Sequence, residues 1–175
     1  EQSALIEIEN RELNLSIQEG VLSSSGFDAT LVSAGWQTPH LQAVINGAPS
    51  LLETAETSLR CVEAYGGQML AVERDADSPM HTIRAGDLYI VPKADRIIIG
   101  ATVEPGRVLS EPEALVIENL QQRASVICPS LGHAKVLEAW AGVRPGTPSH
   151  APMIGATSVA GLFAATGHYR NGILL

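Results

Sequence analysis

Two β-branched segments in the middle of the chain restrict its possible folds more than any other feature. "DLYIVP" (Asp87–Pro92) and "RIIIGAT" (Arg96–Thr102) are rich in residues that favour strands. The residues between them, Lys93–Asp95, have the length of a tight turn. This spacing predicts an antiparallel hairpin, and it excludes an all-helical fold.

Four further segments resemble strands. Alternating apolar and polar residues at Ala4–Glu9 and Leu13–Gln18 predict a hairpin with one solvated face. The apolar runs "ATLVSA" (residues 29–34) and "GLFAATG" (residues 161–167) are bounded by glycines. The first run is typical of a strand that is buried on both faces, and the second is predicted to be a last buried strand.

Two longer segments complete the predicted strands. "KVLEAWAGVRPGT" (Lys135–Thr147) is expected to form a long strand that ends in a Pro-Gly turn. "LRCVEAY" (residues 59–65) and "QMLAVE" (residues 68–73) are expected to be two strand-like runs, joined or kinked at the pair Gly66 and Gly67.

Helical spacing is clearest at Ser110–Ser130, where apolar residues recur on one face and Pro112 suits a helix start. A second, short helix is predicted over Trp36–Ile45, with Gly47 as its cap. The resulting fold class is α+β, with an antiparallel middle flanked by buried strands. Buried strands at both ends fit a sheet whose other strands lie outside this chain.

Composition limits the partners. The 175 residues are 45% hydrophobic with a mean hydropathy of +0.13, as in a folded globular protein. The net charge of −8 argues against nucleic acid or an anionic membrane as a partner. No apolar run is as long as a membrane-spanning helix, which needs about 20 residues.

The residues that commonly bind metals show no metal-site spacing. Cys61 and Cys128 are far apart and are interpreted as reduced thiols of a cytoplasmic protein. No metal is predicted at the five histidines either; they are His40, His81, His133, His150 and His168. The chain starts at "EQSALIEIENR" without a methionine, and both ends are expected to be cuts in a longer protein.

Four stretches carry a resemblance to a known family. They are "GQMLAVE", "LYIVPKADRIIIGATVEPG", "WAGVRPGTPSHAPMIG" and "LFAATGHYRNGILL". In order and spacing they resemble the glycine oxidase branch of the D-amino-acid oxidase family of flavoproteins, over nearly the whole chain. The resemblance implies FAD as the cofactor. It also implies a two-domain flavoprotein, with an antiparallel substrate-domain sheet and returning strands of a Rossmann-like FAD domain.

The resemblance also implies domain limits. Residues 1–35 and 156–175 correspond to parts of the FAD domain, and residues 36–155 correspond to the substrate domain. The family's GxGxxG unit, which binds the FAD pyrophosphate at a helix N-terminus, does not occur in this sequence. Gly66 stands where many relatives have lysine.

Arg144 in "GVRPGT" is the first candidate for substrate binding. A guanidinium binds a carboxylate through two parallel hydrogen bonds, and this arginine follows an apolar strand. The alternative is a solvated arginine at a turn. Tyr89 is the second candidate, as a hydroxyl donor to the same carboxylate. Its alternative is a tyrosine that packs on a sheet face, and the resemblance favours the substrate roles of both residues.

The resemblance places Arg170 near substrate and flavin. A cation at a helix start is electrostatically unfavourable, which is a small argument for an anionic partner. Val103 is expected to line the substrate pocket, or else to be an ordinary strand valine.

The resemblance assigns the flavin contact mainly to backbone groups. Free N–H groups at a helix start stabilise negative charge, and glycines permit close approach. The cofactor-binding residues implied in this way are Gly167, His168, Tyr169, Arg170, Asn171, Gly172 and Ile173, together with Leu5 near the adenine. No catalytic side chain is expected, because the flavin carries out the redox chemistry.

The implied activity is oxidative deamination of glycine, sarcosine or small D-amino acids, with hydride transfer from the substrate α-carbon to the flavin. Imine hydrolysis and release of hydrogen peroxide follow, and the resemblance implies thiamine biosynthesis as a common role of the family. An amino-acid dehydrogenase of the same fold is the close alternative. The isolated chain is expected to be a truncated module without catalysis; a stand-alone carboxylate-binding module is a third possibility. The full-length protein is a possible homo-oligomer.

Overall fold

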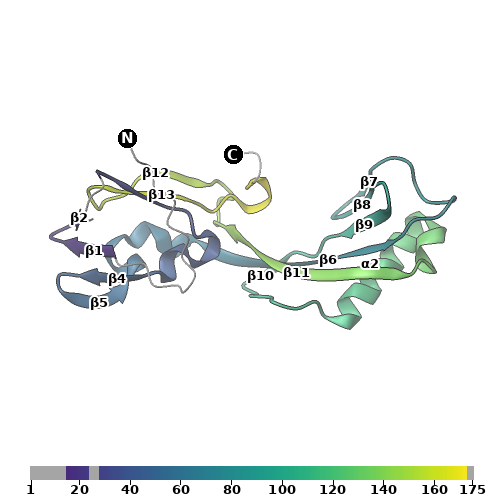
Figure 1. The fold of residues 1–175 in the computed structure, drawn as a ribbon, viewed down its shortest axis with the longest axis horizontal. Helices are drawn as coiled ribbons and strands as arrows, with labels where there is room; N and C mark the ends of the chain where they lie inside the picture. Colours follow the sequence, from purple (N-terminus) through teal and green to yellow (C-terminus); the bar gives the residue numbers. More distant parts are fainter. Residues whose placement is uncertain (1–14, 24–27, 173–175) are drawn as a thin grey trace. The chain divides into compact units, whose positions relative to one another are not determined.

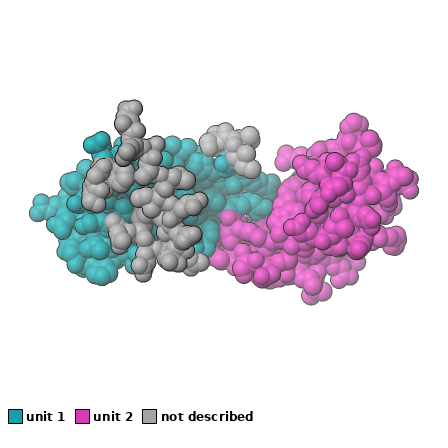
Figure 2. Space-filling view, viewed as in Figure 1, with its two compact units in different colours: residues 1–63, 144–175 teal, residues 64–143 magenta. Residues whose placement is uncertain are grey.

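The computed structural model describes residues 15–23 and 28–172 (Figure 1). The chain divides into two compact units (Figure 2). Unit 1 comprises residues 1–63 and 144–175, and unit 2 comprises residues 64–143. The domain limits expected at residues 35 and 155 concern the FAD and substrate domains of the family, and they stay a prediction. The expected strand at Ala4–Glu9 lies outside the described residues.

The first sheet of unit 1 has the order β2-β1-β4-β5, and β1 and β4 are parallel. Its strands are β1 (Leu15–Gln18), β2 (Val21–Ser23), β4 (Gln42–Ile45) and β5 (Ala48–Leu51). Strand β1 confirms the predicted strand at Leu13–Gln18 over its described residues.

The helix predicted over Trp36–Ile45 is wrong for its second half. The 3-10 helix η1 (Gly35–His40) contains Pro39, which has no N–H to continue a helix, and β4 follows it. Asn46 and Gly47 have φ values of 50° and 82° and form the turn to β5. Gly47 therefore serves a hairpin turn, in which a positive φ is required, and does not cap a helix.

The second sheet of unit 1 has the order β12-β13-β3. Its strands are β3 (Thr30–Val32), β12 (Met153–Ala156) and β13 (Leu162–Thr166), and β3 is parallel to β13. The burial on both faces that was predicted for residues 29–34 is wrong for the described structure. Leu31 is 63% exposed and Phe163 39% exposed, whereas Val32 and Leu162 are buried. Each strand therefore alternates between a core side and an exposed side.

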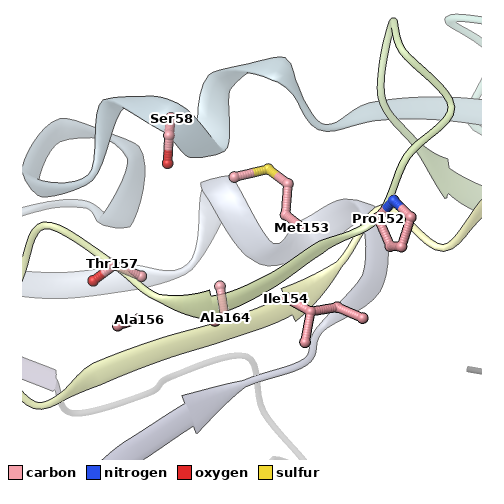
Figure 3. A pocket seen from close by; sticks show the side chains of 8 residues that line it. Ser58, Pro152, Met153, Ile154, Ala156, Thr157 and Ala164 are labelled. Atoms are coloured by element: carbon pink, nitrogen blue, oxygen red, sulfur yellow. The ribbon is translucent and has the colours of Figure 1, made fainter.

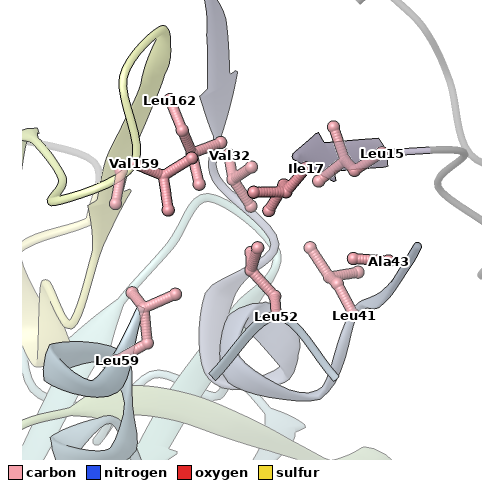
Figure 4. Packing of buried hydrophobic residues seen from close by; sticks show 10 residues of the cluster. Leu15, Ile17, Val32, Leu41, Ala43, Leu52, Leu59, Val159 and Leu162 are labelled. Carbon is pink, nitrogen blue, oxygen red and sulfur yellow. The ribbon is translucent and has the colours of Figure 1, made fainter. Parts of the chain in front are cut away.

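The core of unit 1 lies between the buried sides of these sheets and two short helical segments (Figure 4). These segments are α1 (Leu52–Ala55) and the 3-10 helix η2 (Thr57–Cys61). Leu52 and Leu59 have no exposed surface and contact the same cluster as Ile17 and Leu162. The hydrophobic burial of these side chains joins segments that are far apart in the sequence.

Unit 2 is built on one sheet with the order β10-β6-β9-β8-β7, to which β11 is added beside β6. The strands are β6 (Glu63–Glu73), β7 (Ile83–Ala85), β8 (Leu88–Pro92), β9 (Arg96–Gly100), β10 (Glu104–Pro105) and β11 (Val136–Gly146). The predicted hairpin is confirmed as the antiparallel pair β8–β9, and the predicted long strand is confirmed as β11.

The expected junction at Gly66 and Gly67 is instead the interior of a continuous strand, β6. Gly66 pairs with Glu104 of β10. A Cβ atom on Gly66 would lie 2.8 Å from Leu109 Cδ1, so the missing side chain makes room for a neighbour. The glycine pair therefore permits close packing and does not end the strand.

Helix α2 (Ala114–Ile127) confirms the predicted helix and covers one face of the sheet. Its buried residues Ile117, Leu120 and Ala124 pack against Leu70, Ile90 and Ile99. Glu113 is the N-cap, so Pro112 lies just outside the helix. A short 3-10 helix, η3 (Pro129–Gly132), follows α2. The α+β class is confirmed, and no helix in the described part of the chain is long and apolar enough to cross a membrane.

Candidate functional site

The carboxyl ends of the parallel strands β3 and β13 meet at one edge of their sheet. Soon after these ends come Gly35 and Gly167, whose φ values are +59° and +74°. Thr166 joins the two segments by donating a hydrogen bond from Oγ1 to the carbonyl oxygen of Gly35, at 2.7 Å. In open α/β sheets, ligands bind outside the carboxyl ends of parallel strands. This edge is therefore the candidate site of unit 1.

The end of β11 reaches the same edge. A Cβ atom on Gly35 would lie 3.9 Å from Pro145 Cγ, and a Cβ atom on Gly167 would lie 2.8 Å from Thr147 Cγ2. Thr147 is buried, and its hydroxyl donates to the carbonyl oxygen of Ala151 at 2.8 Å. The half-buried Arg144 directly precedes Pro145. The ends of β3, β11 and β13, which are distant in the sequence, thus meet beside this arginine.

The residues after Gly167 form a single 3-10 turn, η4 (Tyr169–Asn171), within the described chain. Tyr169 has a φ of 52°, and the Cζ atom of Arg170 lies 5.6 Å from the centroid of its ring. The ring of His150, which has a φ of 57°, lies 5.3 Å from the same centroid. Two non-glycine residues in the left-handed region thus contact each other, and such conformations concentrate at functional sites.

The predicted cofactor residues that the structure describes form one continuous segment, which runs from the interior to the surface. Gly167 is buried, His168 and Tyr169 are half-buried, and Arg170, Asn171 and Gly172 are exposed. Ile173 and Leu5 lie outside the described residues. Gly35, Thr147 and Thr166, which support this edge of the sheet, were not predicted from the sequence. The Gly35 signal was present in the sequence as a glycine directly after an apolar strand.

Tyr89 and Val103 belong to unit 2. Tyr89 lies in β8 on the sheet face opposite the α2 cluster, and its hydroxyl donates to Met69 Sδ at 3.4 Å. Val103 is half-buried and follows Thr102, whose hydroxyl donates to Glu104 Oε1 at 2.6 Å. The polar groups next to Val103 are thus held in place, while the roles predicted for Val103 and Tyr89 stay predictions.

An open pocket of about 330 Å³ lies elsewhere in unit 1, beside β12 (Figure 3). Its lining includes Ser58, Met153, Ile154 and Thr157, and none of the predicted site residues. The Ser58 hydroxyl donates to Glu56 Oε1 at 2.6 Å, so this polar group already has a partner. Among residues 15–23 and 28–172, no group of three or more His, Cys, Asp or Glu side chains is arranged to hold a metal ion.

Gly167 gives a direct test of this geometry. Replacing Gly167 with alanine should destabilise the protein by about 2–4 kcal/mol, because the methyl group meets Thr147 Cγ2 and the left-handed φ is costly for alanine. Thermal unfolding of the complete protein measures this loss. Gly172→Ala is the matched control, since its φ is −59° and its nearest neighbour would be 3.8 Å away. Equal melting temperatures for both variants would contradict the predicted constraint.

Comparison with known proteins gives consistent matches. A glycine oxidase from Pseudomonas putida is 31% identical over 176 residues, which cover 99% of this chain and 44% of that protein. The bifunctional protein ThiO/ThiG of Trichormus variabilis is 43% identical over 114 residues, which cover 62% of this chain and 18% of that protein. The crystal structure of glycine oxidase from Bacillus cereus matches with a TM-score of 0.68 and 29% identity, over 97% of this chain and 44% of that chain.

The chain spans less than half the length of these relatives. The family model of FAD-dependent oxidoreductases, DAO, matches residues 4–175. Because this match extends over nearly the whole sequence, the chain belongs to the family of FAD-dependent oxidoreductases.

Proposed function

We propose that the protein carrying this chain catalyses the oxidative deamination of glycine, sarcosine or small D-amino acids. When bound, FAD supplies the two-electron oxidation of the amine to an imine. Hydrolysis of the imine yields a 2-oxo acid and ammonia, or methylamine in place of ammonia when sarcosine is the substrate, and hydrogen peroxide is released where oxygen is the electron acceptor. Sequence identity to proteins named glycine oxidase supports this proposal.

The convergence of Gly35, Gly167 and η4 at one sheet edge is the observation that carries the proposal. The segment that contains η4 presents backbone N–H groups, and the positively charged Arg170 lies in the same segment. This donor set suits the electron-rich pyrimidine end of a reduced flavin. The residues present fit FAD, and we assign its flavin contact to the backbone of Gly167–Gly172.

The substrate would be held by side chains of this chain. We assign Arg144 to the substrate carboxylate, because a guanidinium fixes both the distance and the angle of that group. Tyr89 keeps its proposed role as a hydroxyl donor to the substrate, and Val103 its role as an apolar lining residue. Arg170 would place a second positive charge near the anionic substrate. None of these side chains needs to transfer a proton in this assignment.

A spectrum and an assay test the proposal. The purified complete protein should be yellow, with flavin absorbance in the visible range, and should release peroxide with glycine, sarcosine or a small D-amino acid. A colourless protein that takes up no added FAD would refute the proposed cofactor. Turnover with an artificial electron acceptor but without peroxide would identify the dehydrogenase alternative instead.

We also propose a role in thiamine biosynthesis, from the family resemblance and the relative named ThiO/ThiG. A homo-oligomer of the full-length protein also stays a proposal. Light scattering on the purified complete protein measures its oligomeric state.

A further inference from the structure

Three residues on adjacent strands of unit 2 form a row across the sheet. Met69 of β6 pairs with Gly100 of β9, and Gly100 pairs with Tyr89 of β8. Side chains alternate along a strand, and the neighbouring residues Leu70, Ile99 and Ile90 belong to the cluster under α2. The row therefore occupies the opposite face of the sheet from α2.

The contacts within this row are close. The Tyr89 hydroxyl oxygen Oη lies 3.4 Å from Met69 Sδ. A Cβ atom on Gly100 would lie 2.9 Å from Tyr89 Oη and 3.0 Å from both Cγ and Cε of Met69. The phenol therefore extends over Gly100 toward Met69, and it occupies the space that a side chain at Gly100 would need.

The backbone around this row is held by a polar network centred on one buried residue, Gln68. Gln68 has no exposed surface, and its N–H donates to Thr102 Oγ1 at 2.8 Å. Its side-chain Nε2 donates to Glu104 Oε1 at 3.0 Å, and its Oε1 accepts from the N–H of Glu113 at 2.7 Å. These bonds connect the residue before Met69 to the segment after Gly100. The polar groups of the buried Gln68 are satisfied, which holds the strands in place, and the atoms that a Cβ on Gly100 would meet belong to side chains, so we expect a clash there to move a side chain.

We propose that Met69 and Gly100 are positioning residues that set the location of the Tyr89 hydroxyl and thereby the affinity of the protein for carboxylate substrates. The proposal rests on the substrate role assigned to Tyr89. A thioether sulfur is a weak hydrogen-bond acceptor. The Tyr89 O–H can therefore leave Met69 for a carboxylate oxygen at little cost, while the contact keeps the phenol in place when no substrate is bound.

The test uses the complete flavin-loaded protein and two measurements. Calorimetry gives the Kd of acetate, a non-reacting carboxylate, and steady-state kinetics give KM and kcat for the best amine substrate. Gly100→Ala should raise both Kd and KM by about 10-fold with little change in kcat, because the methyl group displaces the phenol. Met69→Leu conserves the volume and removes the acceptor, and it should raise both constants by about 3-fold.

Gly142→Ala is the matched control. Gly142 also lies in a strand of unit 2, and a Cβ atom there would have nothing within 4 Å. A double-mutant cycle with Tyr89→Phe adds a second control. In the Phe background, the hydroxyl that clashes with the new methyl group is gone, so Gly100→Ala should have a smaller effect.

The outcomes distinguish the positioning role of Met69 and Gly100 from the substrate role of Tyr89. If Tyr89→Phe weakens acetate binding but Gly100→Ala and Met69→Leu match Gly142→Ala, the positioning proposal fails and the role of Tyr89 stands. If Tyr89→Phe leaves acetate binding and KM unchanged, the assigned role of Tyr89 fails, and the positioning proposal fails with it. Should Gly100→Ala not fold, Met69→Leu decides: unchanged constants in that variant overturn the proposal.

Discussion

Replacing Arg144 with alanine should raise the KM for glycine strongly, at a cost of about 2–4 kcal/mol in lost charge-assisted hydrogen bonds. This cost corresponds to about 30- to 1000-fold in kcat/KM. The physical reason is that a neutral methyl group can neither balance the charge of the substrate carboxylate nor fix its angle. Steady-state kinetics on the complete protein measure the effect.

Two variants make this result specific. Arg144→Lys keeps the charge but loses the two-pronged geometry, so its kcat/KM should fall between those of the wild type and the alanine variant. Arg60→Ala removes an exposed arginine of η2 in the same unit and should leave the kinetics unchanged. Wild-type kinetics in Arg144→Ala would remove Arg144 from the substrate site.

Replacing Glu56 with glutamine should destabilise the protein by about 2–3 kcal/mol, because a buried carboxylate loses hydrogen bonds that need two acceptor oxygens. Glu56 is only 4% exposed. Its Oε1 accepts from the N–H and the hydroxyl of Ser58, and its Oε2 accepts from the N–H of Ser158. This carboxylate therefore joins η2 to the segment between β12 and β13. A glutamine would turn its NH₂ group toward one of these donors.

The same contacts predict how stability depends on pH. Burial alone would raise the pKa of Glu56, but the hydrogen bonds from Ser58 and Ser158 outweigh it and lower the pKa from 4.5 to about 2. This difference corresponds to about 3 kcal/mol of stability. Because the pKa is lower in the folded state, the contribution is fully present above pH 4.5. It is lost progressively as the pH falls from about 4.5 toward 2.

Urea unfolding at several pH values tests both the lower stability of Glu56→Gln and the loss of wild-type stability at low pH. The wild type should lose stability more steeply than Glu56→Gln below pH 4.5, and the two proteins should converge near pH 2. Glu53→Gln is the matched control, since Glu53 lies three residues earlier and makes none of the Glu56 hydrogen bonds. Parallel pH profiles for the wild type and Glu56→Gln would contradict the assigned role of this carboxylate.

Local patterns predicted the elements whose determinants are adjacent in the sequence. The hairpin β8–β9 follows from β-branched residues on both sides of a short turn, and α2 follows from apolar residues at helical spacing. Strand β11 was also predictable, since its apolar run ends at a Pro-Gly pair. Each of these elements is favoured by its own residues before any tertiary contact forms.

Elements whose form depends on neighbours were predicted less well. The residues of β4 are compatible with a helix, but they pair with β1 and β5, and this pairing decides the conformation. Gly66 and Gly67 suggest a break when only the sequence is considered. In the structure, Leu109 occupies the space above Gly66, so the same glycine allows the strand to continue.

Some residues of the candidate site could likewise be proposed from the sequence, and others could not. Arg144 could be proposed from the sequence as a cation that follows an apolar strand, and the segment that contains Arg170 could be proposed from its resemblance to the family. Gly35 is marked in the sequence only as a glycine after an apolar strand, and Met69 and Gly100 carry no sequence signal, since the importance of all three lies in distances to other segments. Gly35 accepts a hydrogen bond from Thr166, 131 residues away, and Gly100 leaves room for the hydroxyl of Tyr89.

By itself, the sequence determined the α+β class, the central hairpin, the long helix and the family, because strand propensity, helical period and motif spacing are local properties. Only the tertiary structure decided which glycines face a neighbouring side chain and which carboxylate is buried with its hydrogen bonds satisfied. It also decided where the ends of β3, β11 and β13 meet. The physical reason is that close packing and burial depend on residues brought together from distant parts of the chain, and no local pattern records their distances.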